Sequence, residues 1–206
     1  ESGATALAGV SQPVVVRAQS GAVTLTDLDA SARVTSGSAA VSAANLRGVL
    51  EITTESGSIT GRELGGALRV RTSSGAVNAS WTTPGSADVR TASSSIDLRN
   101  VAGPVAAVTS SGHVTVAGSP AAPWQISAGS GSVELMLPHG ASVALDAATH
   151  SGSVTVRGAE VQGTNDKRAV RGTIGSGGPA VHDPRSAYGE GKLGAPAPAA
   201  APPPPP

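Results

Sequence analysis

Apolar and polar residues alternate in short segments on either side of a Ser-Gly pair that recurs along most of the chain. The pairs are 16 to 21 residues apart, the range in which one repeat forms one coil of a solenoid. Ser93-Ser94 stands where one pair is missing, and Ser2-Gly3 opens the series. The full pairs are Ser20-Gly21, Ser36-Gly37, Ser56-Gly57, Ser74-Gly75, Ser111-Gly112, Ser130-Gly131 and Ser151-Gly152.

The alternation predicts two β-strands per coil that meet at the Ser-Gly corner. Apolar residues at i and i+2 lie on one face of a strand, and the residues between them face water. The strand after the corner places two apolar columns inward: Val23, Ile59, Val77, Ile96, Val114, Val133 and Val154, then Leu25, Val41, Leu98, Val116, Leu135 and Val156. The strand before the corner places inward Val16, Ile52, Val70, Val89 and Ile126. A third short segment adds Leu28, Leu46, Leu64 and Val101.

These elements predict an all-β chain, a single parallel β-solenoid of about nine short coils over residues 1–157. The repeat decays after Gly152, and residues 158–193 are expected to form a degenerate terminal coil or cap. Within it, residues 172–179 are too rich in glycine for a regular strand interior, and residues 188–193 are expected to form a degenerate last strand. Residues 194–206 contain alanine, proline and one glycine, a composition typical of an extended polyproline II or disordered tail.

Composition narrows the possible partners. The formal net charge is zero and aromatic residues are 1%, so the chain has neither the basic field nor the stacking platforms that nucleic-acid binding needs. Cysteine is absent, which excludes disulfides and thiolate metal sites. No apolar run approaches the roughly 20 residues that span a bilayer. The chain starts at Glu1 inside the first repeat, so we expect a processed or excised exported protein.

The repeat units resemble a known family. Leu64 to Gly75 reads Leu-x-Gly-x-Leu-x-Val-x-Thr-x-Ser-Gly. Residues 137–143 precede another Ser-Gly coil, and residues 172–178 carry a Gly-x-x-Gly-Ser-Gly-Gly ending. This combination resembles the bacterial DUF4097 adhesin-like family over roughly residues 1–180. The resemblance implies a right-handed β-solenoid in the periplasm or cell envelope. Residues 183–188 depart from the family pattern, which predicts a specialised C-terminal end.

Candidate catalytic groups have simple structural interpretations. The corner serines lack a Gly-x-Ser-x-Gly elbow, and the four histidines have no metal-ligand spacing, so we predict no catalytic residue, cofactor or metal. Glu51, Arg69 and Asp88 are expected in one outward column, with Arg71 and Arg90 beside it, as a ladder of ion pairs. A further column, Thr54, Thr72, Thr91 and Thr109, would suit either ordinary strand packing or an ice-binding array.

Two tryptophans stand out in a chain so poor in aromatic residues. Trp124 aligns with inward leucine and valine positions and is expected in the core. Trp81 lies in a connection outside the regular strands, where it either forms an exposed interface anchor or folds back over the solenoid. Because polyproline segments bind aromatic-lined grooves, the predicted partner-binding residues are Trp81, Tyr188, Pro202, Pro203, Pro204, Pro205 and Pro206.

The sequence therefore favours a non-enzymatic structural or interaction module, expected as a peripheral accessory subunit on the periplasmic side of a membrane-associated assembly. We expect a protein partner, reached through the proline-rich tail. Two alternatives remain open at this point: an envelope adhesin or glycan-binding protein, and a polysaccharide-active β-helix enzyme, whose paired acids would need a cleft.

Overall fold

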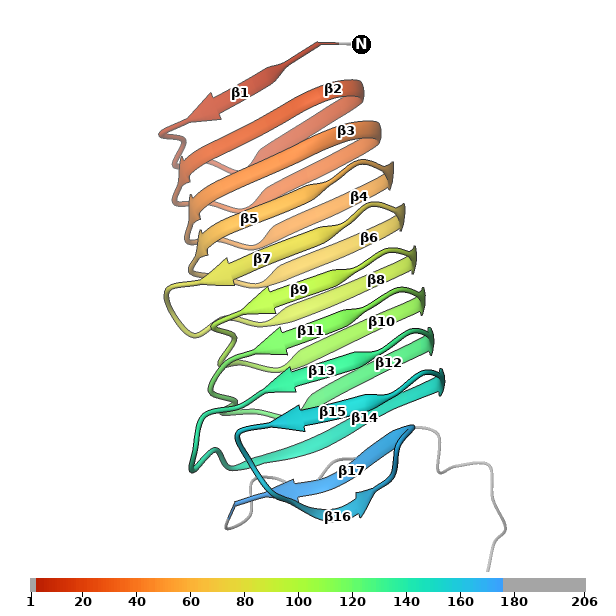
Figure 1. Ribbon diagram of the computed structural model, residues 1–206. Helices are drawn as coiled ribbons and strands as arrows, with labels where there is room; N and C mark the ends of the chain where they lie inside the picture. Colours follow the sequence, from red (N-terminus) through yellow and green to blue (C-terminus); the bar gives the residue numbers. More distant parts are fainter. Residues whose placement is uncertain (1–2, 176–206) are drawn as a thin grey trace, which may run out of the picture.

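The computed structural model describes residues 3–175, and within that range every regular element is a β-strand. The strands stack into one elongated solenoid that runs from β1 at one end to the β16–β17 hairpin at the other (Figure 1). Their bounds are β1 (Thr5–Ala8), β2 (Val14–Leu28), β3 (Ala32–Leu46), β4 (Leu50–Ser56), β5 (Ile59–Leu64), β6 (Leu68–Ser74), β7 (Val77–Trp81), β8 (Ala87–Ser93), β9 (Ile96–Arg99), β10 (Val105–Ser111), β11 (Val114–Ala117), β12 (Trp124–Ser130), β13 (Val133–Met136), β14 (Val143–Ser151), β15 (Val154–Arg157), β16 (Val161–Asn165) and β17 (Ala169–Ile174).

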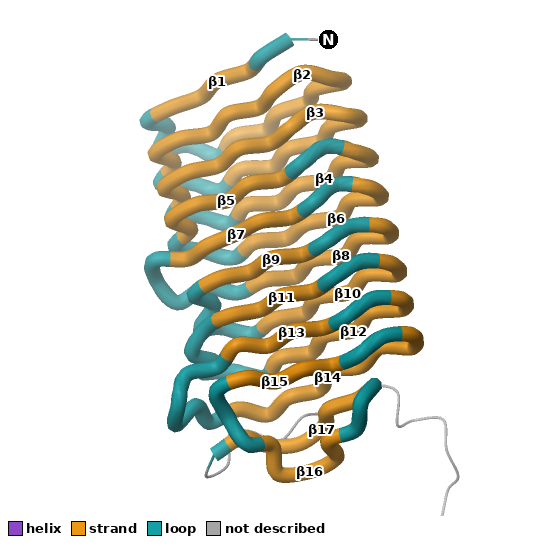
Figure 2. The backbone as a smooth tube through the Cα atoms, viewed as in Figure 1, coloured by secondary structure: helices purple, strands orange, loops and turns teal. Residues whose placement is uncertain are grey.

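Each coil contributes one strand segment to each of two faces. Face 1 consists of the first halves of β2 and β3, followed by β4, β6, β8, β10, β12 and β14. Face 2 consists of β1, the second halves of β2 and β3, then β5, β7, β9, β11, β13 and β15. β2 and β3 continue around the corner, whereas later coils have a short loop there (Figure 2). All these pairings are parallel, which confirms the predicted solenoid with about eight coils rather than nine.

The register corrects one alignment made from the sequence. Ser20 pairs with Ser38, and Gly21 pairs with Ala39, so the corner of the third coil is Ser38-Ala39 and not Ser36-Gly37. Val41 accordingly lies in the column of Val23 and Ile59, while Ala43 takes the place predicted for Val41. The physical period of the early coils is 18 residues, which the misplaced Ser-Gly pair hid.

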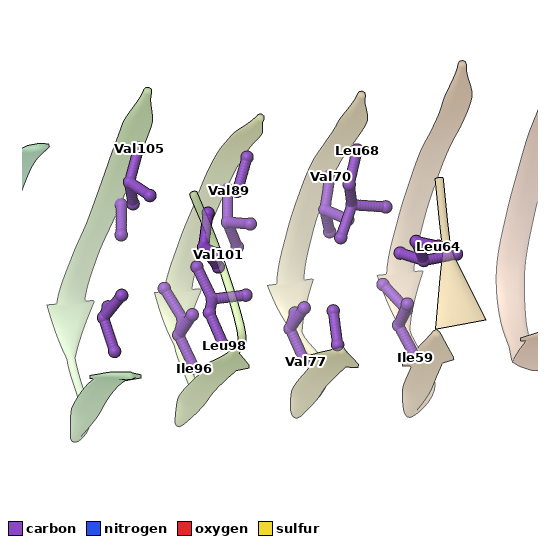
Figure 3. Packing of buried hydrophobic residues seen from close by; sticks show 14 of the residues in the cluster. Ile59, Leu64, Leu68, Val70, Val77, Val89, Ile96, Leu98, Val101 and Val105 are labelled. Carbon is purple, nitrogen blue, oxygen red and sulfur yellow. The ribbon is translucent and has the colours of Figure 1, made fainter. Parts of the chain in front are cut away.

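A continuous aliphatic core fills the space between the two faces. The predicted inward columns are buried at almost every position, and their side chains meet across the coil interior (Figure 3). From β4 to β13 alternate residues point away, so the strand pattern of the sequence is the pattern of burial there, whereas residues 143–147 of β14 are all buried. The corner between β12 and β13 requires glycine: Gly131 has φ 141°, and a Cβ there would overlap the carbonyl oxygen of Gly112.

The stacking changes after β15. β16 and β17 form an antiparallel hairpin, and β17 also pairs antiparallel with β14, the last strand of face 1. Val170 and Ile174 are buried against the end of the core. The glycine-rich prediction is wrong for residues 172–174, because β17 includes Gly172, which lies opposite Gly163 where the two strands approach closely. The expected strand at 188–193 lies outside the described residues.

Candidate functional site

Trp81 is not an exposed anchor. Its side chain is 2% exposed, and the indole Nε1 donates a hydrogen bond to the Gly66 carbonyl oxygen at 3.0 Å. Trp81 pairs in register with Leu64 and so takes the place of the leucines of the third inward segment. The alternative in which the indole folds back over the solenoid is therefore the one the structure shows.

Local chain length explains why the indole turns inward. In neighbouring coils a residue with positive φ, such as Glu63, lies directly before the inward leucine and adds one residue to the strand. The coil of Trp81 lacks this residue, and the register shifts between Gly61 and Leu64. Gly85 lies against the indole, and a Cβ at that position would overlap the ring.

Trp124 is a core residue, as predicted. It is fully buried and pairs with Val105 and Leu145. Its Nε1 donates to the Gly103 carbonyl oxygen at 3.1 Å, the same kind of bond that Trp81 makes. The N–H group of each indole thus has a hydrogen-bond acceptor, the carbonyl oxygen of a glycine, and neither indole is exposed at the surface.

The threonine column lies inside the solenoid. Thr54, Thr72, Thr91 and Thr109 stack in register, and each is at most 7% exposed. Thr54 Oγ1 donates to the carbonyl oxygens of Gly37 and Ser56, each at 3.3 Å. An ice-binding array on these residues is therefore wrong, because their side chains are buried. The hydroxyls of Thr54 and Thr109 bind carbonyl oxygens of the corner, whereas the buried hydroxyls of Thr72 and Thr91 have no hydrogen-bond partner among the described residues.

The corner serines and the histidines do not form a site in the described part of the chain. Ser38 Oγ lies 3.2 Å from Ser56 Oγ, a contact between neighbouring coils. His113, His139 and His150 are exposed. Within residues 3–175, no group of three or more His, Cys, Asp or Glu side chains is arranged to hold a metal ion. The same residues include no apolar helix of membrane-spanning length.

Face 1 carries the charged columns that the sequence predicts. Glu51 pairs with Arg69 and Arg69 with Asp88, while Arg71 lies opposite Arg90. The ladder of ion pairs is incomplete. Arg33 binds Glu51 at 2.7 Å and Arg90 lies 3.3 Å from Asp88, but Arg69 and Arg71 have no carboxylate within 4.0 Å among the described residues.

Two adjoining hollows lie along this face. One, of about 360 Å³, is bordered by Arg33, Glu51, Arg69 and Arg71. The other, of about 500 Å³, borders three accessible apolar residues, Pro104, Ala106 and Pro123, and the polar Ser86 and Gln125. The core residues Leu68, Ala87, Val105 and Trp124, each at most 3% exposed, lie beneath it. Arg69 and Asp88 border both. The sequence analysis missed the second hollow, although Pro104 and Pro123 each stand one residue before a strand in matching register.

Face 2 has a different charge pattern, because its described acids are mostly paired. Asp97 and Arg99 form two hydrogen bonds of 3.0 and 2.8 Å, and this contact raises the pKa of the Arg99 guanidinium above its ordinary value. Glu134 binds Arg157 at 2.8 Å. The remaining predicted partner-binding residues, Tyr188 and Pro202 to Pro206, lie outside the described residues.

The comparison with protein families agrees with this architecture. The model of the Toastrack family, DUF4097, matches residues 65–182, which is 118 of 206 residues. The chain belongs to the Toastrack family. The matched region begins inside the solenoid, whereas the same coil geometry extends back to β2. Searches of curated proteins and of solved structures gave no match.

Proposed function

We propose that this Toastrack protein is a non-catalytic interaction module that serves as a peripheral accessory subunit on the periplasmic side of a membrane-associated assembly. The observation that carries the proposal is the rod itself: about eight coils share one core and present two long, exposed faces. Solenoids bind partners over extended surfaces, to which each coil adds one more strand.

The placement at a membrane rests on the sequence. The resemblance is to a family of the cell envelope, and the alanine- and proline-rich run from Gly194 to Pro206 is a ligand type that partner grooves bind at low entropic cost. The tail and the solenoid would then have separate roles, since the rod is folded around its own core.

The test is co-purification of the full chain with detergent-solubilised membranes, compared with a chain that ends at Leu193. We expect the full chain to be retained and the truncated chain to be retained less, with nearly the same melting temperature, because the tail has no apolar periodicity with which to pack on the rod. A truncated chain that unfolds would contradict this division of roles.

Two outcomes would favour other functions. Selective binding on a glycan array without membrane retention would favour an adhesin or glycan-binding protein. Release of new reducing ends from a polysaccharide would show an enzyme and overturn the proposal.

A further inference from the structure

We infer that face 1 carries a docking site for an acidic segment of a partner protein, centred on Arg69, Arg71 and Arg90. The inference rests on the proposed function, because it assigns the surface with which an interaction module holds its partner. It places that surface on the solenoid, in addition to the tail.

The three arginines are close neighbours on the exposed sheet. Arg69 and Arg71 are two residues apart on β6 and project from the same face, about 6.6 Å apart along the strand. Arg71 lies opposite Arg90 on β8, one coil away, at a strand spacing of about 4.8 Å. Asp88 lies near Arg90, which leaves the charges of Arg69 and Arg71 without a carboxylate partner among residues 3–175.

The pairing of Arg71 with Arg90 opposes folding rather than assisting it. Like charges directly opposite each other on neighbouring strands are destabilising. Elsewhere on the same face the outward column does form a close pair, Arg33 with Glu51 at 2.7 Å. The pairing of Arg71 with Arg90 is therefore not explained by stability of the solenoid. Arg69 lies in register between Glu51 and Asp88, but these two carboxylates are closest to Arg33 and Arg90, so the guanidinium groups of Arg69 and Arg71 can bind an external anion.

The surroundings favour an occupant that is acidic at one end and apolar at the other. Next to the arginines, the hollow of about 500 Å³ has Pro104, Ala106 and Pro123 as its accessible apolar residues. Val108, which pairs with Arg90, is 40% exposed. Over β6, β8 and β10 the surface thus changes from cationic to apolar within a few ångströms.

An extended peptide matches this surface. Its alternate side chains lie about 6.6 to 6.8 Å apart on one side, the spacing of Arg69 and Arg71 along β6. Carboxylates accept paired hydrogen bonds from guanidinium groups, and a neighbouring apolar side chain would fill the hollow. A uniformly acidic polysaccharide fits less well, because its regular charges would also face Asp88 and the apolar wall.

The experiment measures fluorescence anisotropy of a labelled peptide, Gly-Glu-Gly-Glu-Gly-Leu-Gly-Leu, with the full chain at low and high ionic strength. We expect saturable binding that weakens with salt and falls at least tenfold in the Arg69→Gln/Arg71→Gln variant. The matched control is Arg62→Gln/Arg168→Gln, which removes the same charge from two exposed arginines, one on β5 and one in the β16–β17 turn, both away from β6 and β8, and should bind as wild type.

A glutamine-substituted peptide and a labelled oligogalacturonate complete the test. Equal binding of the glutamine peptide, or equal losses in both double variants, would overturn the site. Binding of oligogalacturonate in place of the peptide would overturn the choice of a protein partner. Membrane retention separates the two proposals: if wild type and the Arg69→Gln/Arg71→Gln variant are retained equally and the peptide does not bind, the docking site is wrong and the proposed function stands. Failure of the wild-type chain to co-purify with membranes would contradict the proposed function.

Discussion

At the scale of single residues, the period-2 pattern predicted most of the core correctly because valine, isoleucine and leucine occupy alternate positions on short strands. The same parity places Thr54 two residues after Ile52, and hence inside, so the signal against an exposed threonine array was present in the sequence. At Thr54 and Thr109 the carbonyl oxygens of the corner accept the hydrogen bonds of the buried hydroxyls, whereas Thr72 and Thr91 are buried without such a partner among the described residues.

The position of Trp81 was harder to predict for a physical reason. Val77 and Trp81 are four residues apart, whereas the corresponding Ile59 and Leu64 of the preceding coil are five residues apart. In the sequence, this shortened segment looks like the start of a loop. A large aromatic residue close to Gly85 is the signal that could have been used, since the indole occupies the space that a side chain at that position would need.

Trp81 gives the first stability prediction. Trp81→Phe removes the hydrogen bond to Gly66 and some volume and should lower the free energy of unfolding by about 1 to 2 kcal/mol, whereas Trp81→Ala should lower it by about 3 to 5 kcal/mol. Urea denaturation measures both. In a Trp124→Phe background the remaining indole should be protected from acrylamide quenching; strong quenching together with a neutral Trp81→Ala would mean that the indole is exposed.

At the scale of the elements, the repeat was predicted and its phase was not. Ser36 belongs to the buried threonine column, in register with Thr54, and lies two residues before the true corner at Ser38. Its Oγ accepts a hydrogen bond from the Ala39 amide at 2.8 Å. Ala39 takes the glycine position in that coil, so a motif search found the wrong pair. Aligning the apolar columns rather than the Ser-Gly pair gives 18 residues and removes the error.

The terminal hairpin could not be predicted because it follows no repeat. An antiparallel strand covers the edge of β14 and ends the parallel stacking, which protects an edge that would otherwise pair with another chain. One ion pair spans this junction: Arg171 Nε lies 3.0 Å from Asp146 Oδ1, and the Asp146 side chain is 11% exposed. We expect this contact to hold the hairpin against face 1.

Asp146 therefore gives the second prediction. Asp146→Ala should weaken the junction by about 1 kcal/mol and speed hydrogen exchange of the β17 amides more than those of β6, because local opening of the hairpin becomes easier. The matched control is Arg157→Gln, which breaks a more exposed pair between β13 and β15. Uniformly faster exchange across the whole solenoid, or no change in β17, would contradict a local role for the pair.

At the scale of the whole molecule, stability comes from contacts between neighbouring coils. Each coil pairs only with the coils directly before and after it in the stack, and the core is one continuous cluster along the rod. Such a chain can lose or gain a complete period without changing the geometry of the remaining interfaces. This property separates a solenoid from a sandwich, in which distant strands depend on each other.

Deletion of residues 39–56 tests that property. Ser38 lies beside Ser56, and Ala39 lies beside Gly57, so the two corners are equivalent. The deletion joins Ser38 to Gly57 and so restores a Ser-Gly corner. We expect a folded, cooperative protein with β-rich circular dichroism and a melting temperature lower by about 10 °C or less, since one interface is lost and the others are kept. Deletion of residues 39–47, half a period, is the control: it joins Ser38 to Gly48 and puts turn residues where a face 2 strand must stack, so it should prevent cooperative folding. If the full-period deletion were as damaging as the half-period one, the coils would not be equivalent and the stability of the rod would depend on contacts beyond nearest neighbours.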